Sequence, residues 1–98
     1  MRMQFDRYPD MMDFFYGYLN QDYELCGETF RDVVQHYKDI NARGRHFELA
    51  REIDAFMADH PEDLDMVFER EIKPQVDHTY WGYTTTTFLQ ELKYLLQS

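Results

Sequence analysis

The order of apolar and polar residues along the chain predicts about five short helices, and the first has the densest apolar pattern. This stretch, residues 8–25, places Pro9 at the first helical position, where its missing N–H costs nothing. Seven apolar side chains follow, too many for one stripe: Met11, Met12, Phe14, Phe15, Tyr16, Tyr18 and Leu19. Asp10, Asp13 and Gly17 leave only a narrow polar ridge. Because a helix that is apolar on most sides is usually surrounded by others, we predict that it is the central, aromatic-rich helix of an all-α fold.

Two further helices follow in the next part of the chain. Thr29 is a predicted N-cap, and Asp32 three residues later makes an acidic variant of the capping box. The second helix then covers about residues 30–41, and its apolar positions recur at helical spacing: Phe30, Val33, Val34, Tyr37 and Ile40. The third helix has its apolar face at Phe47, Leu49, Ala50, Ile53, Phe56 and Met57. It ends at His60, because the residue before a proline is disfavoured in the helical region.

The last two helices flank a segment with little helical character. Pro61 suits the first turn of the fourth helix, which ends at Pro74 and has the apolar stripe Leu64, Val67, Phe68 and Ile72. Residues 75–83 have β propensity, but one strand without a partner cannot make a sheet, so we expect an irregular aromatic loop. One of the threonines 84–87 caps the fifth helix, whose apolar positions are Phe88, Leu89, Leu92, Leu95 and Leu96. Without an internal repeat or a linker, residues 1–98 are predicted to form a single small helical domain.

Composition indicates a folded protein of the cytosol. The chain has 98 residues, of which 44% are hydrophobic and 17% aromatic, and this argues against disorder. The single cysteine, Cys26, has no partner for an internal disulfide and no neighbour at metal-ligand spacing, as is typical of a reducing compartment. No basic and apolar signal segment opens the sequence, and no apolar run approaches the ~18 residues of a membrane span. We therefore expect a soluble, cytoplasmic protein.

The formal net charge of −9 is large for a chain of this length. It argues against nucleic-acid binding, which gains affinity by neutralising phosphates. It favours a basic protein partner and fast, salt-sensitive association with that partner. The alternative interpretation is that the charge serves solubility alone.

No group of residues in the sequence has the spacing of a catalytic or metal site. Acids that could work in pairs lie at helix starts or on the polar ridge, where they interact favourably with the helix dipole: Asp10, Asp13, Glu62, Asp63 and Asp65. The four histidines occur singly: His36, His46, His60 and His78. No nucleophile motif and no glycine-rich phosphate loop is present. We therefore predict no catalytic, cofactor-binding or metal-binding residues, and a protein that is not an enzyme.

Two predicted loops carry the residue types that are enriched at protein interfaces. Asp22, Tyr23 and Glu24 place an aromatic ring between two carboxylates, and Tyr80, Trp81 and Tyr83 include the only tryptophan. We predict that these six residues bind a partner protein, as an aromatic centre with an acidic rim. A purely structural alternative stays open, in which Trp81 and Tyr23 cover the ends of a small core and Asp22 bonds to nearby amides.

Two short motifs resemble a known family. The first motif has an aromatic residue before proline (Tyr8 and Pro9) and then an aromatic pair (Phe14 and Phe15). It ends with an aromatic residue, Tyr18, followed after two intervening residues by Gln21, Asp22 and Tyr23. The second is a Thr-x-x-x-aromatic-Leu segment, Thr84 to Leu89, at the start of the last helix. Both are similar to segments of contact-dependent growth inhibition (CDI) immunity proteins. The resemblance covers most of the chain in length and helix order, but only these two places closely.

The resemblance implies an immunity protein that binds and neutralises the C-terminal toxin domain delivered by a neighbouring bacterium, without catalysis of its own. Many such toxin domains are nucleases with basic substrate sites, so an acidic inhibitor could occupy such a site or bind beside it. Two other hypotheses stay open: a small acidic adaptor that binds a basic cytosolic partner unrelated to toxins, and a hydrolase that uses clustered acids with a divalent metal. The oligomeric state is also open, with a monomer favoured.

Overall fold

Helices make up most of the chain, as the apolar pattern predicts. The computed structural model describes residues 8–20, 25, 27–74 and 76–98. Its elements are α1 (Pro9–Gly17), α2 (Phe30–Ile40), α3 (Arg43–Asp59), α4 (Leu64–Val67), the π-helical turn η3 (Phe68–Ile72), the 3-10 turn η4 (His78–Trp81) and α5 (Thr85–Gln97). The described residues contain no strand, and the predicted all-α fold of about five short helices is confirmed. None of the described helices is long and apolar enough to cross a membrane.

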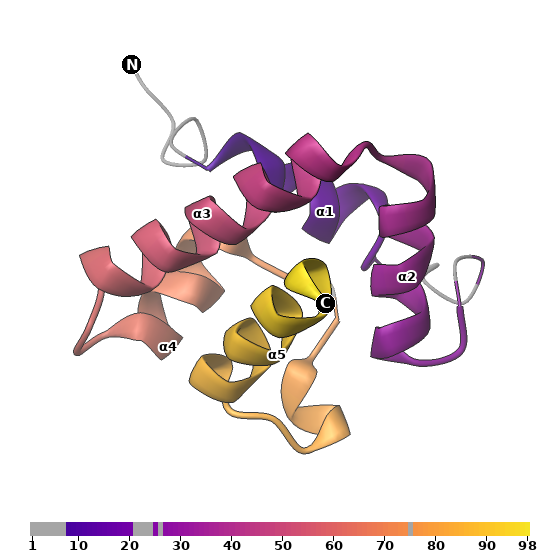
Figure 1. Cartoon of the computed structure of the whole chain (residues 1–98). Coiled ribbons are helices and arrows are strands. Elements are labelled where there is room, and N and C mark those ends of the chain that lie inside the picture. Colours follow the sequence, from indigo (N-terminus) through magenta and orange to yellow (C-terminus); the bar gives the residue numbers. More distant parts are fainter. Residues whose placement is uncertain (1–7, 21–24, 26, 75) are drawn as a thin grey trace.

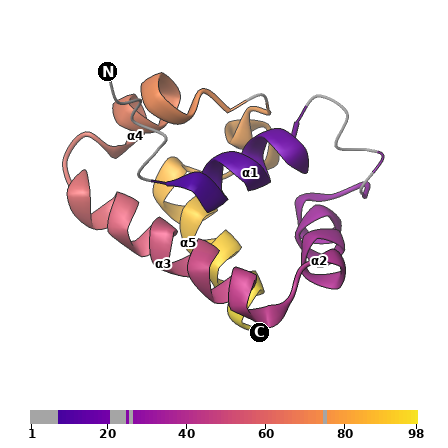
Figure 2. The ribbon, with the colours of Figure 1, turned by 90° about the horizontal axis from the view of Figure 1, so that it is seen from above.

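The helices surround α5, which lies near the middle of the molecule in Figure 1. α3 crosses above it, α2 stands at one side and α4 at the other, and α5 contacts all three together with η4. The view from above shows α1 alongside α3, which it also contacts (Figure 2). The first helix, predicted to be central, therefore shares the centre of the fold with α5.

Aromatic rings from α1, α2, α3, η3 and α5 meet in the core. Phe14 of α1 packs edge-on against Tyr37 of α2, with ring centroids 5.4 Å apart. Phe15 packs edge-on against Phe68 at 5.5 Å and also meets Phe88 of α5 at 6.1 Å. Offset and edge-to-face pairs of this kind add stability beyond the burial of apolar area. The rings of α1 thus join three other elements, in agreement with the predicted aromatic-rich core.

Helix ends follow the polar signals in the sequence. Thr29 and Asp32 form the predicted capping box at the start of α2, and Thr84 forms a second one with Thr87 at the start of α5. His60, before Pro61, ends α3 as expected. α1 ends earlier than the pattern predicts, at Gly17.

Three details of the predicted pattern differ from the structure. Ile40 is 59% exposed because it is the last residue of α2, at the corner where the chain turns into α3. Phe47 is 56% exposed, since it lies about 120° around α3 from Ile53, the centre of the buried stripe. Residues 61–63 form a turn, so the fourth helix begins at Leu64 and not at Pro61.

Candidate partner-binding site

A rigid turn presents the aromatic segment near the end of the chain. The carboxylate of Asp77 accepts hydrogen bonds from the N–H of Thr79 at 3.0 Å and from its hydroxyl at 2.6 Å, and so starts η4. These hydrogen bonds hold the pKa of Asp77 below its usual value. Gly82 ends the turn with φ +86°, a left-handed conformation that favours glycine, and its N–H donates to the carbonyl of Thr79 at 2.9 Å. Both ends of the turn are therefore fixed by the chain itself.

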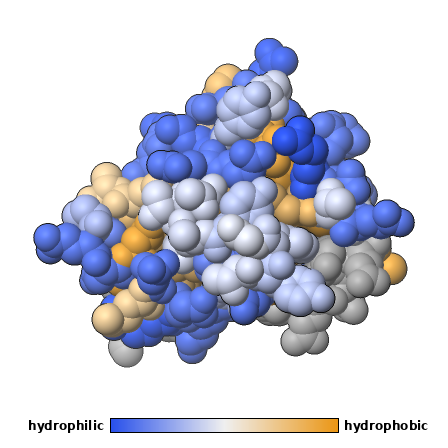
Figure 3. Space-filling model, turned by 90° about the horizontal axis from the view of Figure 1, so that it is seen from below, coloured by the Kyte–Doolittle hydropathy of each residue, from blue (hydrophilic) through white to orange (hydrophobic). Residues whose placement is uncertain are grey.

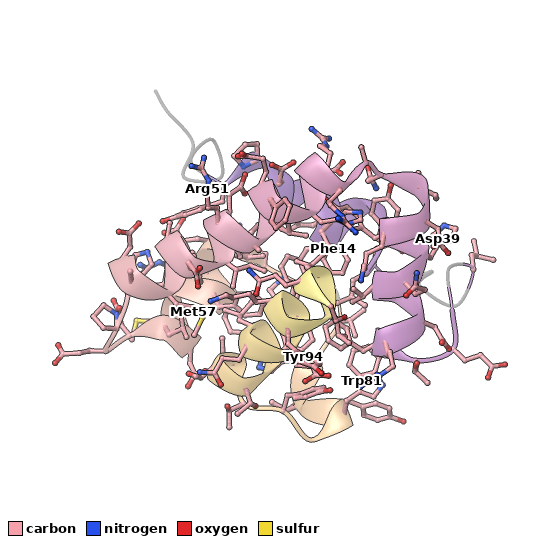
Figure 4. The ribbon with its side chains drawn as sticks, viewed as in Figure 1. Phe14, Asp39, Arg51, Met57, Trp81 and Tyr94 are labelled. Carbon is pink, nitrogen blue, oxygen red and sulfur yellow. The ribbon has the colours of Figure 1, made fainter. Side chains whose placement is uncertain are left out.

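The three aromatic residues of this segment have different environments. Tyr80 is 87% exposed and points away from the core. Trp81 is half-buried and packs on Phe30 of α2, with ring centroids 5.9 Å apart, and Tyr83 packs edge-on against the same ring at 5.9 Å. In Figure 4, Trp81 lies beside the first turn of α2, which agrees with this contact. Trp81 and Tyr83 thus cover one end of the core, as in the structural alternative, whereas Tyr80 is available to a partner.

The segment that carries these rings has no charged side chain of its own. Residues 79–90 contain no charged residue, although 30% of the whole chain is charged. The exposed members of this segment are Thr79, Tyr80, Gly82, Thr84, Thr86, Thr87 and Gln90. Figure 3 shows the molecule from below, with a broad pale area of intermediate hydropathy surrounded mainly by hydrophilic residues. An uncharged aromatic centre with a polar rim is the usual anatomy of a protein interface.

A groove of about 310 Å³ borders the aromatic segment on the side of α4. It is lined by Asp65, Glu69, His78, Thr79, Tyr83, Thr84 and Thr85. Asp65 and Glu69 are exposed and lie about one helical turn apart at i and i+4, so both carboxylates face the same side. Arg70, the only cation of α4 and η3, pairs instead with Glu71 at 3.2 Å. The two acids therefore give the groove a negative wall opposite its aromatic one.

His78 is the buried polar residue of this groove. Its side chain is 3% exposed and lies between Phe88, on which it stacks at 5.0 Å, and Phe68, which it meets edge-on at 5.5 Å. Nε2 is 3.0 Å from the hydroxyl of Thr85. Nδ1 has no hydrogen-bond partner among the described residues, which is uncommon for a buried nitrogen.

The negative charge of the chain is concentrated at one end. Residues 52–71, called the acidic end below, contain eight carboxylates and one arginine, a net charge of −7. Residues 31–51 contain five cations and three acids and so have a net charge of +2. In Figure 1, the acidic end comprises the second half of α3 together with α4 and η3, on the side opposite α2. The groove lined by Asp65 and Glu69 belongs to this end.

The predicted site residues are therefore only partly brought together. Asp22, Tyr23 and Glu24 lie outside the described residues, so their placement beside the aromatic segment stays a prediction. The acidic rim that the structure shows comes from Asp65, predicted only as a helix-start acid, and from Glu69, for which no role was predicted. Their i, i+4 spacing was visible in the sequence, but their neighbour across the groove, residues 78–85, was not. The described residues contain no group of three or more histidine, cysteine or acidic side chains that could hold a metal ion.

The fold and this surface describe a small, acidic, all-α protein with an exposed aromatic segment beside an acidic groove. A family model described as CdiI immunity protein matches residues 7–96. The chain belongs to the CdiI immunity protein family, whose members neutralise a cognate toxin by binding it. No curated protein and no solved structure matches the chain.

Proposed function

We propose that this immunity protein neutralises its toxin by binding alone, through the aromatic segment at residues 79–84 and the acidic groove beside it. The observation that carries the proposal is Tyr80, a large ring that is 87% exposed on a turn fixed at both ends. Exposed tyrosines on rigid supports are frequent hot spots, because they contribute contact area at a small cost in conformational entropy. Asp22, Tyr23 and Glu24 are proposed to extend this surface.

The partner surface on the toxin is proposed to be basic, as in the substrate site of a nuclease. The supporting observation is the net charge of −7 at the acidic end, next to the aromatic segment. A field of this sign attracts a basic domain over a distance of several ångströms and raises the association rate. The inhibitor would then occupy the place of the nucleic acid or bind beside it and exclude the substrate.

Growth of bacterial cells tests the proposal. The C-terminal domain encoded by the gene directly upstream is expressed with and without this protein, and the two proteins are then purified together. We expect arrest of growth by the toxin domain alone, rescue by this protein, and a stable complex. Toxicity without rescue would contradict the proposal and favour a small acidic adaptor for another basic partner.

Absence of catalysis is tested in the same system. An inhibitor that acts by binding protects only in proportion to its amount, so rescue should require at least one copy per toxin molecule. A titration of expression against toxin activity measures this ratio. Complete protection at a small fraction of the toxin concentration would show that the protein inactivates the toxin enzymatically.

A further inference from the structure

We infer that the groove between α4 and η4 receives an arginine side chain of the cognate toxin domain. This inference rests on the proposed function and specifies its chemistry. The occupant follows from the composition of the groove: two carboxylates on one wall, an aromatic ring and threonine hydroxyls on the other, and a buried imidazole. Each of these groups interacts favourably with a planar cation that donates several hydrogen bonds.

The carboxylates are the first part of the argument. Asp65 and Glu69 are both exposed, and neither forms an ion pair with the described residues, since Arg70 is engaged by Glu71. Like charges at i and i+4 on a helix repel each other. A cation placed between them removes this repulsion and gains charge-assisted hydrogen bonds to both. The arrangement is therefore unfavourable for the isolated chain and favourable in a complex.

The opposite wall discriminates between basic side chains. Tyr83 is half-buried, fixed edge-on against Phe30 and also in contact with Phe88, with ring centroids 5.7 Å apart. A guanidinium group stacks on a fixed aromatic face and can donate to both carboxylates at once, because it is planar and has five N–H donors. The ammonium group of lysine is a compact, strongly hydrated charge and fits this geometry less well.

His78 is the independent second observation. It lines the same groove, it is 3% exposed, and its Nδ1 has no hydrogen-bond partner among the described residues. Nε2 is 3.0 Å from the hydroxyl of Thr85, and with Nε2 as the donor of that bond Nδ1 is a buried acceptor in the lining of the groove. A buried acceptor and two unpaired carboxylates in the lining of one groove favour the same occupant, a hydrogen-bond donor with positive charge.

The test compares two double variants of equal charge. Asp65→Asn with Glu69→Gln alters the groove, whereas Asp39→Asn with Glu48→Gln removes two exposed acids outside both the groove and the acidic end. Affinity for the purified toxin domain is measured by calorimetry, and thermal unfolding is measured for each variant alone. We expect the groove variant to bind at least about tenfold more weakly and the control to stay within about threefold of the unaltered protein. The melting temperature of the groove variant should stay within about 2 °C of the unaltered protein, because the lost repulsion and the lost interaction of Asp65 with the helix dipole are similar in size.

The toxin side of the contact is tested by replacing each of its arginines, first by alanine and then by lysine. At one toxin arginine, either replacement should weaken binding. Combined with the groove variant, the same replacement should weaken binding no further. Equal affinity of the groove variant and the control would overturn the inference while leaving the proposed function intact. Tolerance of lysine at every toxin arginine would overturn the assignment to arginine. Absence of binding by the unaltered protein would overturn the proposed function and, with it, this inference.

Discussion

The carboxylate of Glu52, in the middle of α3, accepts a hydrogen bond from the main-chain N–H of Met11 at 2.9 Å. A second bond, from the N–H of Asp10 at 3.0 Å, makes Glu52 the cap of the first turn of α1. Tyr8, at the N-cap position, makes no side-chain capping bond, so the cap comes from a residue more than forty positions away. The start of the aromatic-rich helix is thus tied directly to α3.

This cap makes stability depend on pH. Burial, together with the nearby Asp10 carboxyl, raises the pKa of Glu52 from 4.5 to about 7, against the two N–H bonds that lower it. The folded state therefore holds the proton more tightly than the unfolded chain, so this contribution is complete below pH 4.5 and is lost as the pH rises through about 7. The full rise in the pKa would correspond to roughly 3 kcal/mol of stability. Screening of the half-exposed carboxylate by water reduces this contribution to about 1 kcal/mol. Urea unfolding between pH 5 and 8 should show this decrease.

The substitution Glu52→Gln removes the titrating group and keeps an oxygen that accepts an N–H. The free energy of unfolding of this variant should therefore decrease less between pH 5 and 8, by the contribution of Glu52. Glu48→Gln, one turn earlier on α3 and exposed, is the matched control and should behave as the unaltered protein. The same pH slope in both variants would show that Glu52 is not the responsible group.

Tyr16 joins α1 to the end of the π-helical turn. Its hydroxyl lies within hydrogen-bond distance of the carbonyl oxygens of Ile72 and, at 2.8 Å, of Lys73, which has the left-handed φ of 51° before Pro74. Tyr16→Phe leaves these carbonyls without this donor. It should lower the free energy of unfolding by about 1 kcal/mol and the melting temperature by about 4–8 °C. Tyr94→Phe, in a residue that is 63% exposed, is the control and should change stability by less than about 0.5 kcal/mol. Equal melting temperatures would contradict the proposed role of the hydroxyl.

Charge reversal of Asp22 and Glu24 tests the predicted extension of the binding surface. Lysine at both positions should weaken toxin binding by about tenfold or more, since like charges would then face a basic partner. The melting temperature should stay within about 2 °C, the range expected for surface substitutions. A parallel decrease of affinity and melting temperature would indicate that these acids serve the fold, as the structural alternative holds.

Features that depend on neighbouring positions in the chain could be predicted from the sequence. The capping box at Thr29, the cap of α5 by one of the threonines 84–87, and the end of α3 at His60 are set within three or four residues, and all are confirmed. The buried stripe of α5 follows from the 3.6-residue period alone. Contacts between distant positions could not be read in this way. The cap of α1 by Glu52 and the groove formed by Asp65 with residues 78–85 arise only when the helices pack.

The exposed aromatic residues show the same limit. Tyr80 and Trp81 are neighbours in the chain and were predicted to act together, but one is 87% exposed and the other packs on Phe30. Nothing in the local pattern distinguishes them, because a 3-10 turn was not predicted there. Phe47 was assigned to the core for its residue type, although its angle around α3 places it outside the buried stripe.

This difference between Tyr80 and Trp81 can be measured. Tyr80→Ala should leave the melting temperature unchanged and weaken toxin binding by at least about 2 kcal/mol, the effect expected of a hot spot. Trp81→Ala should lower stability as well, because it exposes Phe30 and the end of the core. Tyr94→Ala removes another exposed ring, on α5, and serves as the control for both measurements. Undiminished affinity of the Tyr80 variant would exclude the turn as the centre of the interface.

The uneven distribution of charge predicts a salt-dependent association rate. Attraction between the acidic end and a basic toxin is screened as the Debye length shortens, so the rate should decrease about tenfold or more between about 20 and 500 mM salt. Stopped-flow mixing measures this rate. Glu62→Gln with Asp63→Asn at the acidic end should reduce the salt dependence more than Asp13→Asn with Asp39→Asn, which lie outside it and remove the same charge. An association rate that is equal at low and high salt would contradict electrostatic steering, and equal effects of the two variants would mean that only the total charge matters.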